Sequence, residues 1–212
     1  PSAAHPLTTR LYEHMQAHHP GVRLNVAEAQ GAELEALLDG GAVDLAILFR
    51  FQRPSGVDEK LLCVAHTYLV SQPGDPLTAR ATVDFARLEG LRLVLPRRPS
   101  QWRHALDETA RSLGFELQPA IEADSLTLQK ELVARHAGLY SILGPFSFTR
   151  ELEAGHVQAS RLVKPELTRH VTLAFPRHGK LTPACRVVAQ TLEGLILSWG
   201  NALTEPAPPA SL

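Results

Sequence analysis

The chain has 212 residues, of which 44% are hydrophobic and 20% charged, and its formal net charge is −1. A chain of this length can bury a hydrophobic core, either as one large domain or as two small ones. The near-zero charge excludes a protein whose whole surface is a basic footprint for nucleic acid. No window approaches the roughly 18 consecutive apolar residues that a membrane-spanning helix needs.

The first third of the chain predicts two helices and two strands. The first helix carries Leu7, Leu11 and Met15 on one face at helical spacing. The second helix is short and ends at Gly40-Gly41, which can form a left-handed stop. The first strand is expected at Val22–Ala27, where apolar and polar residues alternate. The second is expected at Val43–Phe49, which is almost continuously apolar.

The rest of the chain repeats this alternation of strand and helix. The strands expected here are Leu61–Ala65, Thr67–Val70, Leu91–Leu95, the surroundings of Ile121, and Leu139–Leu143. Helices are expected over Ser100–Leu113, after an N-cap at Ser125, and after an N-cap at Thr182. The Pro/Ala-rich residues 205–212 are expected to form a frayed tail. The alternation predicts an α/β fold with mostly parallel sheets, either as one large sheet or as two small doubly wound halves.

The sequence shows no catalytic motif. It lacks the Gly-x-Ser-x-Gly elbow of serine hydrolases, the Walker loop and the Rossmann glycine pattern. The only cysteines, Cys63 and Cys185, are expected to be reduced and mostly buried, with one long-range disulfide as the alternative. His14 and His18 have the spacing of metal ligands on a helix, but a solvated helix face is the favoured interpretation. We therefore expect no catalytic residue, no metal and no cofactor.

Small polar residues stand where strands give way to helices, at Ser2, Gln30-Gly31 and Asp124-Ser125. The free N–H groups at a helix start favour a bound carboxylate or phosphate. The alternative is that each serine only caps its own helix. A cluster of three arginines can likewise be a solvated basic patch or a set of pocket residues that pair with an anion, namely Arg97, Arg98 and Arg103.

Six segments carry a resemblance that extends over residues 1 to about 202. They are Pro1–Ala4, His19–Leu24, Leu37–Ile47, Asp75–Leu77, Glu131–Leu143 and Leu181–Ala184. Together and in this order, they resemble the effector-binding (regulatory) domain of LysR-type transcriptional regulators. The clearest is the Asp-Gly-Gly-Ala-Val-Asp-Leu-Ala-Ile phrase at residues 39–47. The residues Asp124–Leu126, Ile142–Pro145 and Pro165–Arg169 are most similar to the branch that includes nitrogen-assimilation regulators.

The resemblance implies two doubly wound Rossmann-like lobes joined by two crossover strands, as in type 2 periplasmic binding proteins. Lobe I would comprise residues 1–66 and 168–212, and lobe II residues 67–167. The domain would sense a small, anionic effector between the lobes, would assemble with itself, and would not be an enzyme. The residues that would hold the effector are Ser2, Ala3, Gln30, Gly31, Phe49, Arg50, Pro96, Arg97, Gly144 and Pro145.

The implied partners are the effector and further copies of the chain, in a dimer or tetramer that uses the helix Pro6–His18 and the strand Val22–Ala27. Promoter DNA and RNA polymerase would be partners only through the full-length protein, because the family's N-terminal winged helix-turn-helix is absent here. The start at Pro1 and the single methionine, Met15, also predict a fragment of a longer polypeptide. A cytoplasmic location is expected, with no membrane partner. The alternative is a free-standing periplasmic solute-binding protein of a transporter, and an enzyme is a third hypothesis.

Overall fold

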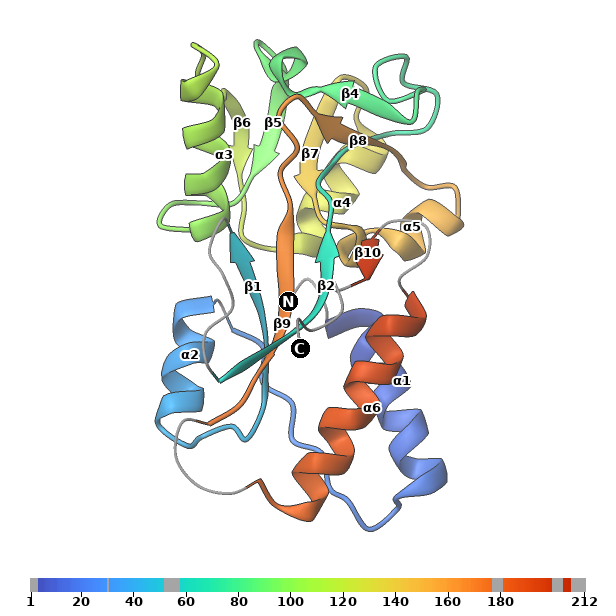
Figure 1. Ribbon diagram of the computed structural model, residues 1–212. Coiled ribbons are helices and arrows are strands. Elements are labelled where there is room, and N and C mark those ends of the chain that lie inside the picture. The colour runs from blue at the N-terminus through green and yellow to red at the C-terminus, as the bar shows by residue number, and fades with distance from the viewer. Residues whose placement is uncertain (1–3, 30, 52–57, 177–180, 200–203, 207–212) are drawn as a thin grey trace. The chain divides into compact units, whose positions relative to one another are not determined.

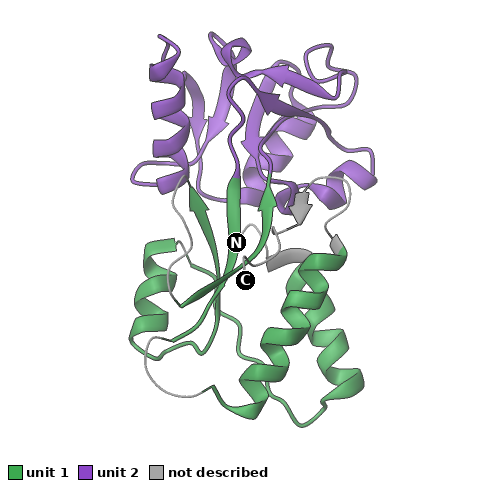
Figure 2. Cartoon of the chain, in the orientation of Figure 1, with its two compact units in different colours: residues 1–65, 169–212 green, residues 66–168 purple. Residues whose placement is uncertain are grey.

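The structure is a computed structural model in which residues 4–29, 31–51, 58–176, 181–199 and 204–206 are described (Figure 1). The chain divides into two compact units, which are coloured separately in Figure 2. Unit 1 comprises residues 1–65 and 169–212, and unit 2 comprises residues 66–168. Each unit has its own β-sheet and its own helices, so that both are of the α/β class that the sequence predicts.

Unit 1 contains a four-stranded sheet and three of the described helices. The strand order is β1 (Ala46–Phe51), β9 (Arg169–Ala174), β2 (Glu59–Ala65) and β10 (Thr204–Pro206). The helices are α1 (Ala4–His18), α2 (Gly31–Asp39) and α6 (Pro183–Trp199). All three strand pairs are antiparallel, which differs from the mostly parallel sheets predicted from the sequence. The reason is the path of the chain, because it leaves unit 1 after β2 and returns in the opposite direction through β9.

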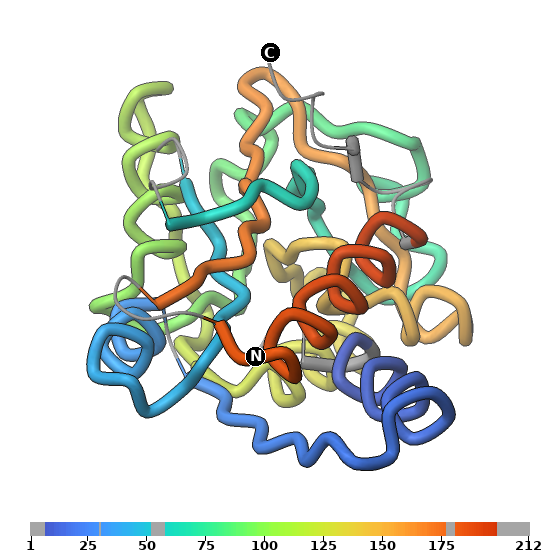
Figure 3. The backbone as a smooth tube through the Cα atoms, turned by 60° about the horizontal axis from the view of Figure 1, so that its bottom comes forward, coloured from blue at the N-terminus to red at the C-terminus, as the bar shows by residue number. Residues whose placement is uncertain are grey.

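The helices of unit 1 bury the faces that the apolar spacing predicts. Leu7, Leu11 and Met15 of α1 are all buried, and α1 lies beside α6, as Figure 3 shows for the dark blue and red segments. The shorter helix α2 packs on β1, where a small apolar cluster joins it to the sheet. The buried members of that cluster are Leu38, Ala46, Leu48 and Ala174.

Two expectations for unit 1 were wrong. Residues 22–29 form neither helix nor strand, although Val22 and Leu24 are half-buried as their alternation predicts. A strand needs a hydrogen-bonded neighbour, and none of the described strands pairs with this segment; Val26 is 52% exposed. The expected frayed tail is also partly ordered, since Thr204–Pro206 forms β10 and pairs with the end of β2. Residues 207–212 lie outside the described part of the chain.

Unit 2 contains a six-stranded mixed sheet. The strand order is β4 (Thr82–Asp84), β8 (Gln158–Val163), β3 (Tyr68–Ser71), β7 (Leu139–Leu143), β5 (Arg92–Leu95) and β6 (Pro119–Glu122). The described helices are α3 (Gln101–Ser112), α4 (Leu126–Arg135) and α5 (Thr149–Glu153), with short 3-10 turns at Phe85–Leu88 and Pro145–Ser147. β3 runs antiparallel to both of its neighbours, whereas β4–β8, β7–β5 and β5–β6 are parallel pairs.

The core of unit 2 lies around its central strands. Every residue of β7 is buried, and the strand has the bounds of the short apolar strand expected at Leu139–Leu143. One large apolar cluster of this core has the following members that are at most 1% exposed: Leu69, Phe85, Leu88, Leu93, Leu95, Leu106, Ala110, Ile142 and Leu162. Both predicted N-caps are confirmed. In unit 2, Ser125 Oγ accepts a hydrogen bond from the Leu128 N–H at 3.3 Å. In unit 1, Thr182 Oγ1 accepts one from the Cys185 N–H at 3.1 Å. These caps fix where α4 and α6 begin.

Candidate ligand-binding residues

Three neighbouring parallel strands of unit 2 end at one edge of its sheet. β5 pairs in parallel with β6 on one side and with β7 on the other. The segments that follow these strands are Pro96–Arg97 after β5, Asp124–Ser125 after β6, and Gly144–Pro145 after β7. Ligands of α/β proteins bind at such carboxyl ends of strands. The structure therefore brings the four unit 2 residues expected from the resemblance to the same edge, together with Asp124 and Ser125.

Arg97 is held at this edge by Asp124. The Arg97 backbone N–H donates to Asp124 Oδ1 at 3.0 Å, and its Nε donates to Oδ2 at 2.6 Å. These hydrogen bonds from Arg97 lower the pKa of the Asp124 carboxyl. The Arg97 side chain is still 69% exposed, and within the described part of the chain its Nη1 and Nη2 donate to no other residue. The two Nη groups of Arg97 are thus available to a planar anion.

Arg103 has a different role from Arg97, although the sequence places both in one basic cluster. Its side chain is fully buried, and Nη1 donates to the Pro96 carbonyl at 3.1 Å and to Glu122 Oε1 at 2.7 Å. Its Nε donates to Asp107 Oδ1 at 3.0 Å, and the more exposed Arg98 reaches the same carboxylate. Arg103 is therefore neither part of a solvated basic patch nor placed to contact a ligand. Its guanidinium instead links α3, β6 and the end of β5.

Gly144 and Pro145 form a compact turn at the end of β7. The Gly144 carbonyl accepts a hydrogen bond from the Ser147 N–H at 3.0 Å, and the Pro145 carbonyl accepts one from Thr149 Oγ1 at 2.7 Å. Pro145 itself is buried. The adjacent strand is anchored from α3, where the Trp102 Nε1–H donates to the Ile142 carbonyl at 3.2 Å. The turn is therefore rigid by packing and by local hydrogen bonds.

In unit 1 the predicted residues Ser2, Ala3 and Gln30 lie outside the described residues, whereas Gly31 is the first residue of α2. Phe49 and Arg50 lie in the second half of β1. Phe49 is half-buried, and its ring lies 5.3 Å from the guanidinium carbon of Arg169, which is itself buried. Loss of hydration lowers the pKa of Arg169 to about 10, and the face of an aromatic ring offers such a desolvated cation partial compensation.

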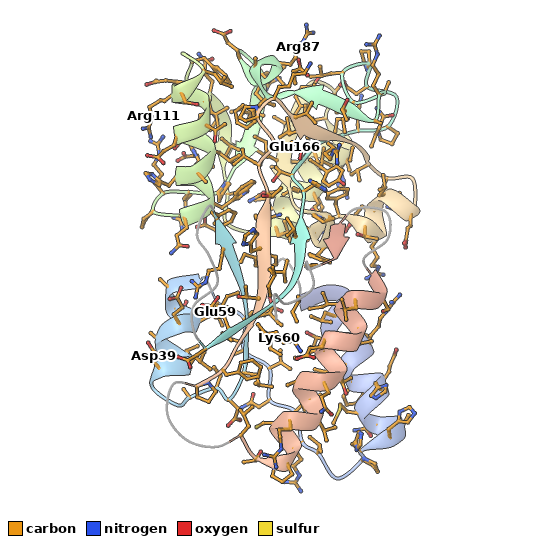
Figure 4. The ribbon with its side chains drawn as sticks, viewed as in Figure 1. Asp39, Glu59, Lys60, Arg87, Arg111 and Glu166 are labelled. Atoms are coloured by element: carbon orange, nitrogen blue, oxygen red, sulfur yellow. The ribbon has the colours of Figure 1, made fainter. Side chains whose placement is uncertain are left out.

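Arg50 is a buried link between three elements of unit 1. Its side chain is 6% exposed, its Nη1 lies 2.5 Å from Glu35 Oε1 on α2, and its Nε and Nη2 donate to Glu59 on β2. Figure 4 shows Glu59 beside this part of the sheet. The hydrogen bond to Glu59 is the main cause that raises the pKa of Arg50. Thr172 Oγ1 also donates to Glu59, at 2.9 Å. Since two carboxylates already use the Arg50 guanidinium, an anion would bind it only by displacing one of them.

Asp124 is the site residue that the list derived from the resemblance omits. The sequence does contain a signal for it, because an Asp-Ser pair directly before a helix combines a carboxylate with an N-cap. What the sequence lacks is the neighbour, since Arg97 lies 27 positions away along the chain and reaches Asp124 only through the β5–β6 pairing.

The described residues contain no multi-ligand metal centre. No group of three or more His, Cys, Asp or Glu side chains among them is arranged to hold a metal ion. Cys63 and Cys185 are both free thiols, the first buried and the second half-buried. Burial raises the pKa of the Cys63 thiol to about 12, which is the opposite of what a reactive cysteine needs.

In the part of the chain that the structure describes, no helix combines the length and apolarity of a membrane span.

The sequence model of the family described as "LysR substrate binding domain" matches residues 1–195. The chain belongs to this family. Among its relatives are the nitrogen assimilation regulatory protein nac of Klebsiella aerogenes, 26% identical over 92% of this chain, and the regulator CfxR of Cupriavidus necator, 27% identical over 92%. The chain spans 63% and 62% of the length of these two relatives. The predicted family and the similarity to nitrogen-assimilation regulators are thereby confirmed.

Solved structures show the same fold. The regulatory domain of CcmR from Synechocystis PCC6803, solved in complex with 2-PG, superposes with a TM-score of 0.76 at 14% identity and covers 92% of this chain and 93% of that one. A LysR family regulator from Pseudomonas aeruginosa superposes with a TM-score of 0.74 at 20% identity and covers 92% and 69%. The type 2 periplasmic-binding-protein-like α/β fold is confirmed. Because the relatives are transcription regulators, the regulator hypothesis is favoured over a transporter's solute-binding protein.

Proposed function

We propose that this chain is the effector-sensing and oligomerisation domain of a LysR-type regulator, and that it binds a small anionic metabolite without transforming it. The observation that carries the proposal is the match to the LysR substrate binding domain over residues 1–195. The anionic class is supported by Arg97, whose guanidinium is exposed, charged and oriented by Asp124 at the carboxyl ends of β5 and β6. An oriented guanidinium loses little conformational freedom when it binds a carboxylate or phosphate.

The proposed effector-binding residues remain the ten expected from the resemblance. These are Ser2, Ala3, Gln30, Gly31, Phe49, Arg50, Pro96, Arg97, Gly144 and Pro145. Among the described ones, Arg97 supplies the charge. Arg50 acts by positioning, because its ion pair with Glu35 holds α2 at a point one helical turn after Gly31.

In the full-length regulator, we expect the effector to change contacts with promoter DNA or RNA polymerase, in the cytoplasm. The free energy available for that change is the difference between the effector's affinities for the two conformations of the regulator, and no more. A metabolite that binds both conformations equally tightly would leave transcription unchanged.

Thermal unfolding of the chain in the presence of small anions tests the proposal. The probes are 2-PG, inorganic phosphate and a panel of small carboxylates, each titrated from micromolar to millimolar concentration. We expect at least one of them to raise the melting temperature progressively, because binding at about 100 times Kd stabilises the folded state by about 2.7 kcal/mol. A complete panel without any stabilisation would refute the anionic class of effector.

A pair of arginine variants locates the binding. Arg97→Ala should weaken the affinity for the stabilising anion about tenfold or more, since a hydrogen bond to a charged group contributes about 1.5–3 kcal/mol. The matched control is Arg111→Ala, which removes an exposed arginine from the last turn of α3 (Figure 4). Equal affinities in both variants and the unchanged chain would remove Arg97 from the site.

We also propose that the chain self-associates through α1. Support comes from its outward face, where Thr9 is exposed and Tyr12 is 55% exposed, although solvated helix faces of this kind also occur without a partner. Thr9→Glu places a charge on this face and should shift sedimentation toward the monomer. Thr82→Glu, at an exposed position of β4, is the matched control in unit 2. Sedimentation of the Thr9 variant identical to that of the unchanged chain would place the interface elsewhere.

A further inference from the structure

Three histidines gather at the C-terminal end of α1, and the effector-binding function does not use them. His14 and His18 are one helical turn apart, and their rings stack with centroids 4.3 Å apart and an interplanar angle of 22°. The ring of His19, just beyond the helix, has its centroid 6.4 Å from that of His14. His18 is exposed and His14 is half-buried, so that the pair is accessible from solvent.

A hydrogen bond orients the ring of His18 as it is oriented in metal sites. His18 Nδ1 lies 3.0 Å from the backbone carbonyl oxygen of His14. A carbonyl oxygen only accepts, so Nδ1 is the protonated nitrogen and the lone pair of the neutral ring is at Nε2. Histidines that bind metals donate their other ring N–H to a backbone carbonyl or a carboxylate in this way. In the neutral ring this hydrogen bond leaves the Nε2 of His18 available to a metal ion.

The spacing and the charge of the site also suit a metal ion. Residues one helical turn apart lie on the same face of a helix, and the contact between the His14 and His18 rings, with centroids 4.3 Å apart, brings both imidazoles to one place. Because the two ring planes are nearly parallel, the His14 ring has to rotate out of the stack before one ion can bind the lone pairs of both rings at about 2.0–2.1 Å. His18 lies in the last turn of α1. The C-terminus of a helix carries a partial negative charge that favours a nearby cation.

We propose that His14 and His18 chelate one divalent transition-metal ion of the kind that prefers imidazole, namely Cu²⁺, Ni²⁺ or Zn²⁺. The chain supplies two ligands and water completes the coordination, in keeping with the absence of a three-ligand group among the described residues. Hard ions such as Mg²⁺ do not bind there, because they prefer oxygen ligands. The bound ion bridges two successive turns and stabilises the end of α1.

Calorimetric titration of the untagged chain with each metal chloride tests the site. We expect binding of Cu²⁺ that is tighter than that of Ni²⁺ or Zn²⁺, as the usual order of affinities for nitrogen ligands requires, and no heat from Mg²⁺. His14→Ala and His18→Ala should each lose one bound ion per chain or weaken its affinity at least tenfold. His104→Ala, which removes an exposed histidine from α3 in unit 2, is the matched control and should bind as the unchanged chain does.

Thermal unfolding gives a second measurement that separates this site from the other histidines of the chain. Cu²⁺ or Ni²⁺ should raise the melting temperature of the unchanged chain and of His104→Ala, but not that of either α1 variant, because only a chelated pair cross-links the helix. The circular dichroism spectrum of each variant shows whether it is folded. Stoichiometry, affinity and melting shift that are the same in His18→Ala as in the unchanged chain would overturn the proposal.

Discussion

Replacing Arg50 by methionine tests whether a buried ion pair holds α2 and β2 to the centre of unit 1. Arg50 and Glu59 have side chains that are 6% and 8% exposed, so that both charges are almost fully removed from water. Arg50→Met keeps most of the side-chain volume and removes the positive charge. Glu59 then keeps its hydrogen bond from Thr172 but loses the guanidinium. Breaking a buried pair from one side costs about 3–5 kcal/mol, because a charge stays buried without compensation.

The free energy of unfolding of Arg50→Met is compared with that of two companion variants, each measured by urea unfolding followed by circular dichroism. Glu35→Gln should cost only about 1 kcal/mol, since the Glu35 side chain is 31% exposed and remains hydrated. The double variant Arg50→Met with Glu59→Met should recover to within about 1–2 kcal/mol of the unchanged chain, because no buried charge is left. A loss below about 1 kcal/mol for Arg50→Met alone would refute the reasoning. So would a double variant no more stable than the single one.

Three further predictions concern unit 2. Burial and a hydrogen bond to Asp75 raise the pKa of Tyr140 to about 12. The neutral phenol therefore contributes stability that is fully present below pH 10, the ordinary pKa of tyrosine, and is lost as the pH rises to about 12. Tyr140→Phe should reduce this alkaline loss of unfolding free energy, measured by urea unfolding, by about 2–3 kcal/mol. Ser125→Ala should cost about 1 kcal/mol of unfolding free energy, because α4 loses its N-cap, and an unchanged urea midpoint would contradict this. Arg97→Ala should raise the pKa of Asp124 in an NMR titration, because the hydrogen bonds from Arg97 lower that pKa. The stabilisation that comes from this pairing is present at neutral pH and is lost as the pH falls through the lowered pKa.

The features that the sequence predicts well are those that depend on residues close together in the chain. Leu7, Leu11 and Met15 face the core of unit 1, because helical spacing alone brings them to one side of α1. The caps at Ser125 and Thr182 involve a side chain and a backbone N–H three residues apart. The apolar run at residues 139–143 predicts a strand, and β7 has the same bounds. The family follows from the order of several short phrases of this kind.

The features that the sequence left open all depend on a partner distant in the chain. The alternation at Val22–Ala27 indicates half-burial but does not supply the neighbour that would make the segment a strand. Arg97 and Arg103 look alike in sequence, yet one is exposed beside Asp124 and the other is buried among the carboxylates of α3 and β6. Long-range packing sets strand direction, ion-pair partners and burial, because residues far apart in the chain meet only when the sheets have formed. For this reason the local pattern reveals the elements and the family, whereas only the folded unit shows that Arg97 is exposed and Arg103 is buried.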